Sequence, residues 1–202
     1  MTKGEAKKLA LRWLDEATLN GQEAGAELTA DYKDKFNYFL YNVLVYVAAV
    51  FKISRTFSVM ATDGTAKGTY VSFVLPNDVM ELDKIVRYNA SQYDQVRAFR
   101  KEGDNVYLIP KNFIGENDTI DFIYWGMPTL VAVDDEDTVN IEVVPKAEQL
   151  VPLRLAIEAT AGSDETSGIS AYLEGKYSNM IANLLGEEQG AVSGMVERVY
   201  AQ

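Results

Sequence analysis

Apolar residues recur every three or four positions in four segments of the chain, which is the spacing of one face of an α-helix. Two segments, residues 6–17 and 32–50, lie near the N-terminus, and residues 145–161 and 169–185 lie near the C-terminus. After Asn42 the second segment is apolar nearly all round, so its C-terminal half needs cover on several sides. The pattern predicts one pair of helices at each end of the chain.

Glycine and proline positions set the expected limits of these helices. Residues 20–28 are rich in glycine and small residues and predict a linker. Pro145 suits a first helical turn, whereas Pro152 predicts either a kink or a later start of the third helix. The stripe of the fourth helix stops at Gly186, where we expect that helix to end.

Between the helix pairs the hydrophobic period changes to two, which is typical of strands. Short runs rich in β-branched and aromatic residues alternate with turns and predict about six antiparallel strands. The last run is apolar on both faces except at Asp121, so we expect it in the centre of a sheet or beneath the helices. The expected strands cover residues 53–59, 69–75, 84–88, 95–100, 106–109 and 119–125.

This order of elements predicts an α+β fold, in which the N-terminal and C-terminal helix pairs form a helical bundle and an antiparallel β-sheet domain is inserted between them. On this division, residues 1–52 and 142–186 form the bundle, and residues 53–141 form the inserted domain.

Residues 187–202 remain as a C-terminal arm with a short apolar pattern that cannot fold alone. The arm is either a frayed tail, a last turn packed on its own bundle, or a segment that docks on another protein. Its apolar positions are Val192, Met195, Val196, Val199 and Tyr200.

The amino-acid composition excludes several kinds of catalytic chemistry. The 202 residues include no cysteine and no histidine, which excludes disulfide, thiolate, Ser-His-Asp and histidine–metal chemistry. The net charge of −11 opposes tight capture of nucleic-acid phosphates. Residues 1–8 do not resemble a signal peptide, and the longest apolar run, residues 43–51, falls far short of the roughly 20 residues that span a bilayer. We expect a protein made in the cytoplasm, with no membrane partner.

Two motifs suggest ion or phosphate binding, and both are incomplete. Gly168 and Gly175-Lys176 resemble a phosphate loop, but the glycines are seven apart instead of five, and Tyr177 replaces the hydroxyl ligand of magnesium. The acidic run Asp134-Asp135-Glu136-Asp137 lacks the turn glycine and the distant glutamate of a calcium loop. A solvated loop is favoured, with weak calcium binding as the alternative.

Carboxylates and tyrosines offer the remaining candidate chemistry. Asp121 and Glu142 can be drawn as the carboxylate pair of a glycoside hydrolase, although an acidic chain contains many such pairs. The 12 tyrosines can stack sugars or bases, but Tyr32, Tyr172 and Tyr177 stand at spacings that favour a core or an interface. The sequence therefore predicts no catalytic, metal or cofactor site.

Three stretches of the chain form a series of motifs. In residues 74–78, with Glu81-Leu82 after them, a strand leaves at a proline, and in residues 120–125, with Pro128 after them, a strand ends in an aromatic residue and a proline. Residues 142–145 and Leu150 form an acidic-apolar-proline helix start, and residues 171–177 belong to a helix with tyrosines five residues apart. These motifs in this order resemble the head-to-tail adaptor (connector) proteins of tailed bacteriophages.

The resemblance implies a structural virion protein without enzymatic activity. It implies a homo-oligomeric twelve-fold ring, or dodecamer, in the neck of the virion, below the portal. That ring joins the capsid to the next neck or tail protein and lets DNA pass during genome ejection without specific binding. The C-terminal arm, with Val192, Met195, Val196, Val199 and Tyr200, matches the family's portal-binding segment.

Two other classes of function stay open. One is a β-sandwich module that binds carbohydrate through its aromatic side chains, and the other is an enzyme that uses carboxylate catalysis.

Overall fold

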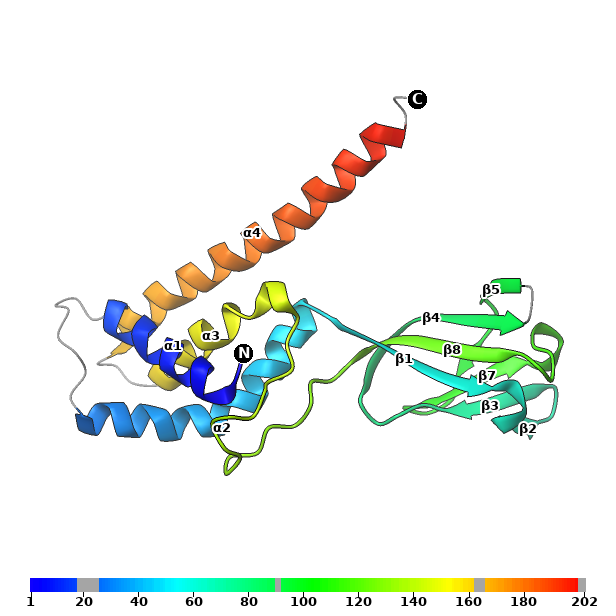
Figure 1. Cartoon of the computed structure of the whole chain (residues 1–202), viewed down its shortest axis with the longest axis horizontal. Coiled ribbons are helices and arrows are strands. Elements are labelled where there is room, and N and C mark those ends of the chain that lie inside the picture. Colours follow the sequence, from blue (N-terminus) through cyan, green and yellow to red (C-terminus); the bar gives the residue numbers. More distant parts are fainter. Residues whose placement is uncertain (18–25, 90–91, 162–165, 200–202) are drawn as a thin grey trace. The chain divides into compact units, whose positions relative to one another are not determined.

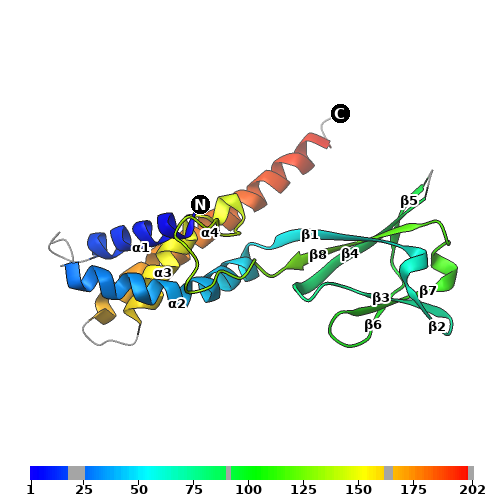
Figure 2. The ribbon, with the colours of Figure 1, turned by 60° about the horizontal axis from the view of Figure 1, so that its bottom comes forward.

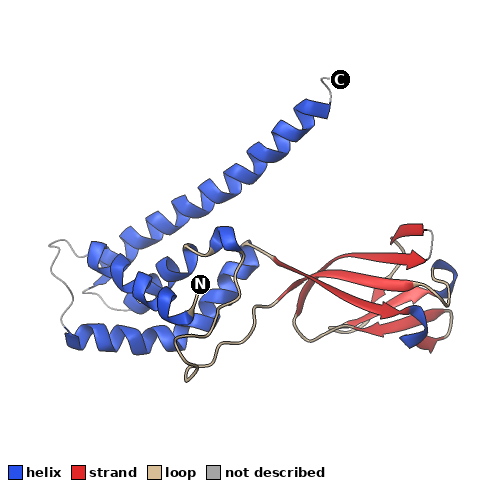
Figure 3. Ribbon diagram, viewed as in Figure 1, coloured by secondary structure: helices blue, strands red, loops and turns tan. Residues whose placement is uncertain are grey.

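The computed structural model describes residues 1–17, 26–89, 92–161 and 166–199, with side chains for residues 1–15, 32–89, 92–161, 166 and 168–186. The chain divides into two compact units. Met1–Phe51 and Thr129–Gln202 form the helical unit, and Lys52–Pro128 form the sheet unit. The long helices all belong to the first unit and the strands of both sheets to the second (Figures 1 and 3).

The helical unit is built around its shortest α-helix. Helix α3 (Leu150–Thr160) contacts α1 (Lys3–Ala17), α2 (Ala26–Val50) and α4 (Ser167–Val199), which pack around it (Figure 2). Nine of the 11 residues of α3 are buried, so this helix has almost no polar face.

The core of the helical unit draws on all four helices and on the segment that precedes α3. Small residues of α1 allow it to approach α3 closely, and larger side chains from α2 and α3 fill the space between the helices. The principal buried side chains are Ala6, Ala10, Leu14, Phe36, Leu40, Val43, Leu44, Val47, Phe51, Val131, Ile141, Leu150, Leu153, Leu155, Ile157, Leu173 and Tyr177.

The helix limits differ from the sequence prediction at three points. Helix α2 begins at Ala26, inside the expected linker. A 3₁₀ turn, Pro145–Ala147, precedes α3, and Pro152 is the third residue of α3, so the later start is confirmed and no helical hydrogen bond is lost. The predicted end at Gly186 is wrong, because α4 continues to Val199. A single glycine costs a helix only about 1 kcal/mol, which its neighbours can offset.

The sheet unit contains two four-stranded antiparallel sheets. The first has the order β1-β8-β4-β5, and the second has the order β2-β3-β7-β6. The ring of Phe122 lies at the centre of the core, with the rings of Phe57, Phe73 and Tyr107 within 6.4 Å of it. The strands are β1 (Ile53–Met60), β2 (Thr65–Lys67), β3 (Tyr70–Val74), β4 (Val79–Asn89), β5 (Gln92–Val96), β6 (Arg100–Lys101), β7 (Val106–Pro110) and β8 (Thr119–Gly126).

The inserted antiparallel β structure is confirmed, with corrections to single strands. Strand β8 lies between β1 and β4, so its predicted central place is correct. The predicted strand 95–100 is divided between β5 and β6, and the short strand β2 was not predicted. Strand β4 begins at Val79, and irregularities between Val79 and Glu81 and between Leu82 and Lys84 break its alternation.

The segment after the sheet unit belongs with the helices, although the sequence division placed it in the inserted domain up to residue 141. Its backbone pairs with the start of α1: the amide of Lys3 donates to the carbonyl of Val139 at 2.8 Å, and the amide of Ile141 donates to the carbonyl of Met1 at 3.1 Å. Val131 and Ile141 are buried in the core of the helical unit. These contacts carry no periodic signal, which is why sequence patterning missed them.

Candidate assembly surfaces on the helical unit

Lys3 fixes the acidic segment to the helical unit. Its side chain is almost fully buried, at 1% exposure, and the Nζ donates to the carbonyl oxygens of Ala132, Val133 and Asp135 at 3.1, 2.9 and 2.8 Å. All three ammonium protons therefore have an acceptor. The three carbonyl oxygens that converge on Lys3 stabilise its buried ammonium group.

The side chains of the acidic run are also engaged. Asp135 accepts from the amide of Ala132 at 2.6 Å, and Asp137 accepts from Lys7 Nζ at 2.6 Å. Among the residues whose side chains are described, no group of three acidic, histidine or cysteine side chains is arranged to hold a metal ion. The acidic run is therefore a loop held in place by Lys3 and Lys7 of α1.

Arg154 and Glu158 are the two half-buried residues of α3. Arg154 donates to Glu158 at 2.6 Å, one helical turn away. The guanidinium carbon lies 4.5 Å from the ring centroid of Tyr46 and 5.7 Å from that of Tyr177, so an aromatic ring from α2 and another from α4 contact the same cation. This cluster joins α2 to α4 across α3.

Two donors in this cluster lack acceptors. The hydroxyl of Tyr177 and the Nε of Arg154 are buried without a hydrogen-bond partner in the described part of the chain. Burial raises the pKa of Tyr177 to about 12, while the charge of Arg154 works in the opposite direction. The phenol is thus held neutral beside the outward face of α2.

The outward face of α2 is uncharged over four helical turns. No charged residue occurs between Lys35 and Lys52, although this side of the helix is exposed in the described chain. Tyr38 and Tyr46 are 68% and 48% exposed. Interfaces between proteins are depleted in charge and enriched in tyrosine, so this face has the composition of a contact surface. We call Tyr38, Asn42, Tyr46, Ala49 and Val50 the tyrosine face.

The outward side of α4 carries small residues at helical spacing. All of them are exposed, and a Cβ added at any of its three glycines would meet nothing within 4 Å, so the helix surface is open there. The only charged residues in this stretch are Glu174 and Lys176, and Lys176 Nζ lies 5.1 Å from the ring centroids of both Trp13 and Tyr172. We call Gly168, Ala171, Gly175, Ser178, Ala182 and Gly186 the small-residue face.

This arrangement also explains why the phosphate-loop motif has no counterpart. Gly168, Gly175 and Lys176 lie within the regular helix α4, and Lys176 packs on aromatic rings. A phosphate loop needs a glycine-rich turn whose amides point at the ligand, and a helix interior has no free amides to offer.

The predicted arm lies on the continuation of α4. Leu184 is the last residue of this helix that packs against the core among the described side chains, yet the helix continues to Val199 (Figure 1). Val192, Met195, Val196 and Val199 lie within the helix bounds, and their side chains are outside the described part of the structure. Tyr200 lies outside the described residues.

The proposed carboxylate pair belongs to two different units. Asp121 stands on β8, where desolvation first, and then the charge of Asp121 and a hydrogen bond to it, raise the pKa of Tyr88. Glu142 belongs to the helical unit and accepts from the backbone amide and the hydroxyl of Thr129, at 2.8 and 2.7 Å. Each carboxylate is engaged within its own unit. Tyr32, on α2, stacks with Phe36, which is buried in the core.

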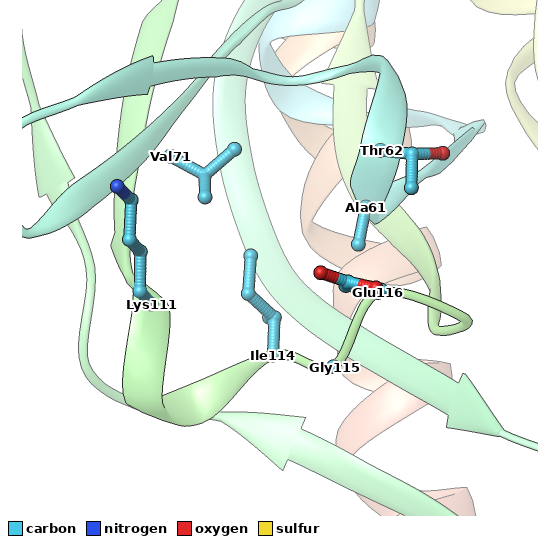
Figure 4. Close-up of a pocket in the computed structure, with 7 residues that line it drawn as sticks. All are labelled: Ala61, Thr62, Val71, Lys111, Ile114, Gly115 and Glu116. Atoms are coloured by element: carbon cyan, nitrogen blue, oxygen red, sulfur yellow. The ribbon is translucent and has the colours of Figure 1, made fainter.

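A cavity of about 360 Å³ opens in the sheet unit between the turn after β1 and the loop before β8 (Figure 4). Ala61, Val71 and Ile114 form its apolar part, and Thr62, Lys111 and Glu116 are exposed beside them. No aromatic ring lines it. Sugar-binding sites rely on stacked aromatic rings, so this cavity does not supply what the carbohydrate-binding alternative needs.

Comparison with known proteins gives no assignment. No protein-family model matches the chain, and no curated protein matches it. Within the described residues, no helix combines the length and the apolar character needed to cross a membrane.

The sequence patterns did not reveal the roles of Lys3 and Arg154, nor the small-residue face. Lys3 finds its carbonyl acceptors, and Arg154 its two aromatic rings, far along the chain, so no local pattern marks these contacts. The tyrosine face has a sequence signal, the long stretch without charged residues between Lys35 and Lys52. From this stretch the sequence predicts a helix that is covered on several sides. The structure leaves one side of it exposed.

Proposed function

We propose that this chain is a structural virion protein, the head-to-tail adaptor of a tailed bacteriophage. Copies of it form a twelve-fold ring below the portal, which joins the capsid to the next neck or tail protein. Viral DNA passes through the ring, and the protein acts by its shape and its contacts without catalysis.

One observation carries this proposal: a chain with a net charge of −11 leaves two exposed helix faces nearly free of charge. Charged residues make up about 25% of a typical soluble domain and lie mostly on its surface. Charge is absent from the tyrosine face and almost absent from the small-residue face. Faces of this kind favour contacts between protein subunits, which a ring needs on every copy.

The charge of the chain fits a conduit for DNA. An acidic subunit repels phosphate groups at a distance, so DNA is able to slide past without being held. The architecture is also compatible, because the helical unit carries the antiparallel sheet unit as an insertion between α2 and α3.

The continuation of α4 suits the portal-binding arm. At about 1.5 Å per residue, the part of α4 after Leu184 extends roughly 22 Å. The sequence places Val192, Met195, Val196 and Val199 on one side of this extension. We propose that this side, together with Tyr200, binds the portal protein.

Deleting residues 190–202 tests the proposal. The helical core ends its described contacts at Leu184, so the truncated chain is expected to keep its melting temperature and to lose only the far-ultraviolet circular dichroism of the helical residues removed, 190–199. Electron micrographs are expected to show that it no longer attaches to purified phage portal rings, whereas the full chain does. A Glu187→Ala, Glu188→Ala variant changes the same helix before its apolar positions and serves as the control. Equal attachment by the truncated and full chains would refute the role of the arm.

A further inference from the structure

We propose that the tyrosine face of one copy packs against the small-residue face of α4 in the next copy. This inference rests on the proposed function in one respect, since it supplies the contact between neighbouring subunits of the ring. The partner of both faces is a second copy of this chain.

Shape is the first argument. The tyrosine face projects two large rings, Tyr38 and Tyr46, while the small-residue face offers three glycines and two alanines with open space above each glycine. Large side chains pack well where the opposing helix lacks them, because the two backbones can then approach closely. At about 1.5 Å per residue the two faces are about 20 and 28 Å long, so their lengths match well enough to pack side by side.

Charge is the second argument. Two copies of a chain with a net charge of −11 repel one another, and a contact between them is least opposed where neither side carries charge. Nucleic acid is a poor alternative partner, because the tyrosine face offers no cation to a phosphate.

Unpaired donors beside the tyrosine face are the third argument. Tyr177 is only 4% exposed, and neither its hydroxyl nor the Nε of Arg154 has an acceptor in the described chain. Tyr46 packs over both side chains, with its ring centroid 6.3 Å from that of Tyr177. Buried donors are normally paired, and Ser178 of the small-residue face, with the neighbouring exposed Asn179, brings acceptor oxygens.

The two faces belong to different helices, so the contact is heterologous. Each copy uses its α2 on one neighbour and its α4 on the other, and such contacts close into a ring when the rotation between copies allows it. A helix face about 20 Å long and 10 Å wide covers roughly 200 Å², far below the ~800 Å² per partner of a stable pair. A single contact is therefore weak, and lasting assembly needs every copy to make the contact twice.

Disulfide trapping tests this inference, and the chain suits it because it has no cysteine of its own. Asn42→Cys places a thiol in the middle of the tyrosine face, and Ser178→Cys places one in the middle of the small-residue face. The two single variants are mixed at high concentration, oxidised, and separated by electrophoresis without reducing agent. Lys8→Cys, at an exposed position of α1, replaces Asn42→Cys in the control mixture.

The Asn42→Cys and Ser178→Cys mixture is expected to give roughly tenfold more of the mixed dimer than the control, because a bound pair holds the thiols at high effective concentration. A chain carrying both changes is expected to give a ladder of covalent multimers whose highest band is the ring. Yields equal to the control refute the contact. Strong dimerisation of Asn42→Cys alone also refutes it, since that result shows two tyrosine faces meeting.

A charge variant provides a second readout. Ala182→Glu puts a carboxylate on the small-residue face and keeps a good helix former there, and Lys8→Gln makes the same change of net charge away from both faces. Light scattering is expected to show loss of assembly only for Ala182→Glu. If wild-type rings form on portals and both tests fail, the contact is wrong and the proposed function stands. If the wild-type chain forms no ring with any portal, the proposed function falls as well.

Discussion

Replacing Lys3 with methionine tests how the acidic segment is held to the helices. The change keeps most of the apolar stem and removes the ammonium group that three carbonyl oxygens share, from Ala132, Val133 and Asp135. A buried acceptor left without a donor costs about 1–3 kcal/mol, and here the three carbonyls belong to half-buried or exposed residues, so water can replace part of what they lose. We therefore expect the free energy of unfolding of the helical unit to fall by about 1–3 kcal/mol, a sizeable share of the 5–15 kcal/mol typical of a domain.

The measurement is urea unfolding followed by tryptophan fluorescence. The two tryptophans lie in different units, Trp13 on α1 and Trp125 on β8, so a Trp125→Phe background reports on the helical unit alone. Lys8→Met, which changes an exposed lysine of the same helix, is the control and is expected to shift stability by less than about 0.5 kcal/mol. A loss below about 1 kcal/mol for Lys3→Met would show that water replaces the ammonium and would refute the reasoning.

Two further predictions concern single positions, one in each unit. Tyr177 has a folded pKa of about 12 against an ordinary value of 10.0, so the unfolded chain ionises first as the pH rises. The neutral phenol of Tyr177 therefore contributes fully to the free energy of unfolding below pH 10, and this contribution is lost as the pH rises through 12. Tyr177→Phe is thus expected to be at least as stable as the parent at pH 7 and to lose less stability between pH 10 and 12, by urea titration of the helical unit; a steeper loss would contradict this. In the sheet unit, a Cβ at Gly64 would lie 2.7 Å from Phe73 Cε1 and also overlap Val71, so Gly64→Ala is expected to lose about 1–3 kcal/mol in thermal unfolding. Gly186→Ala meets nothing within 4 Å on α4 and is expected to gain about 0.5–1 kcal/mol; equal behaviour of the two glycines would show that the sheet unit can relax.

The fold was predictable where one period ran without interruption. Helix α1, the second half of α2 and the strands β1 and β8 each bury one clear set of positions, and their existence and order follow from that pattern alone. Strand β4 shows the limit, because its irregular pairing between Val79 and Lys84 breaks the alternation that marks a strand. The start of α2 at Ala26 was hidden by a composition typical of a linker.

The candidate surfaces were predictable only in part. The long uncharged stretch of α2 is visible in the sequence, but which side of it stays exposed depends on how α3 and α4 pack. The small-residue face is also present in the sequence, at spacings of three and four. Its meaning depends on the exposure of Gly175 and Ala182, which follows from burial of the opposite side of α4 at Leu173 and Tyr177. The contacts of Arg154 with the rings of Tyr46 and Tyr177 join three helices and have no local signal.

Electron microscopy of the full chain mixed with purified phage portal rings tests the central claim most directly. The account predicts closed twelve-fold rings of this protein seated on one end of the portal, with neighbouring copies in contact through α2 and α4. Portal rings that stay bare at saturating concentrations of a folded, monomeric chain would contradict it.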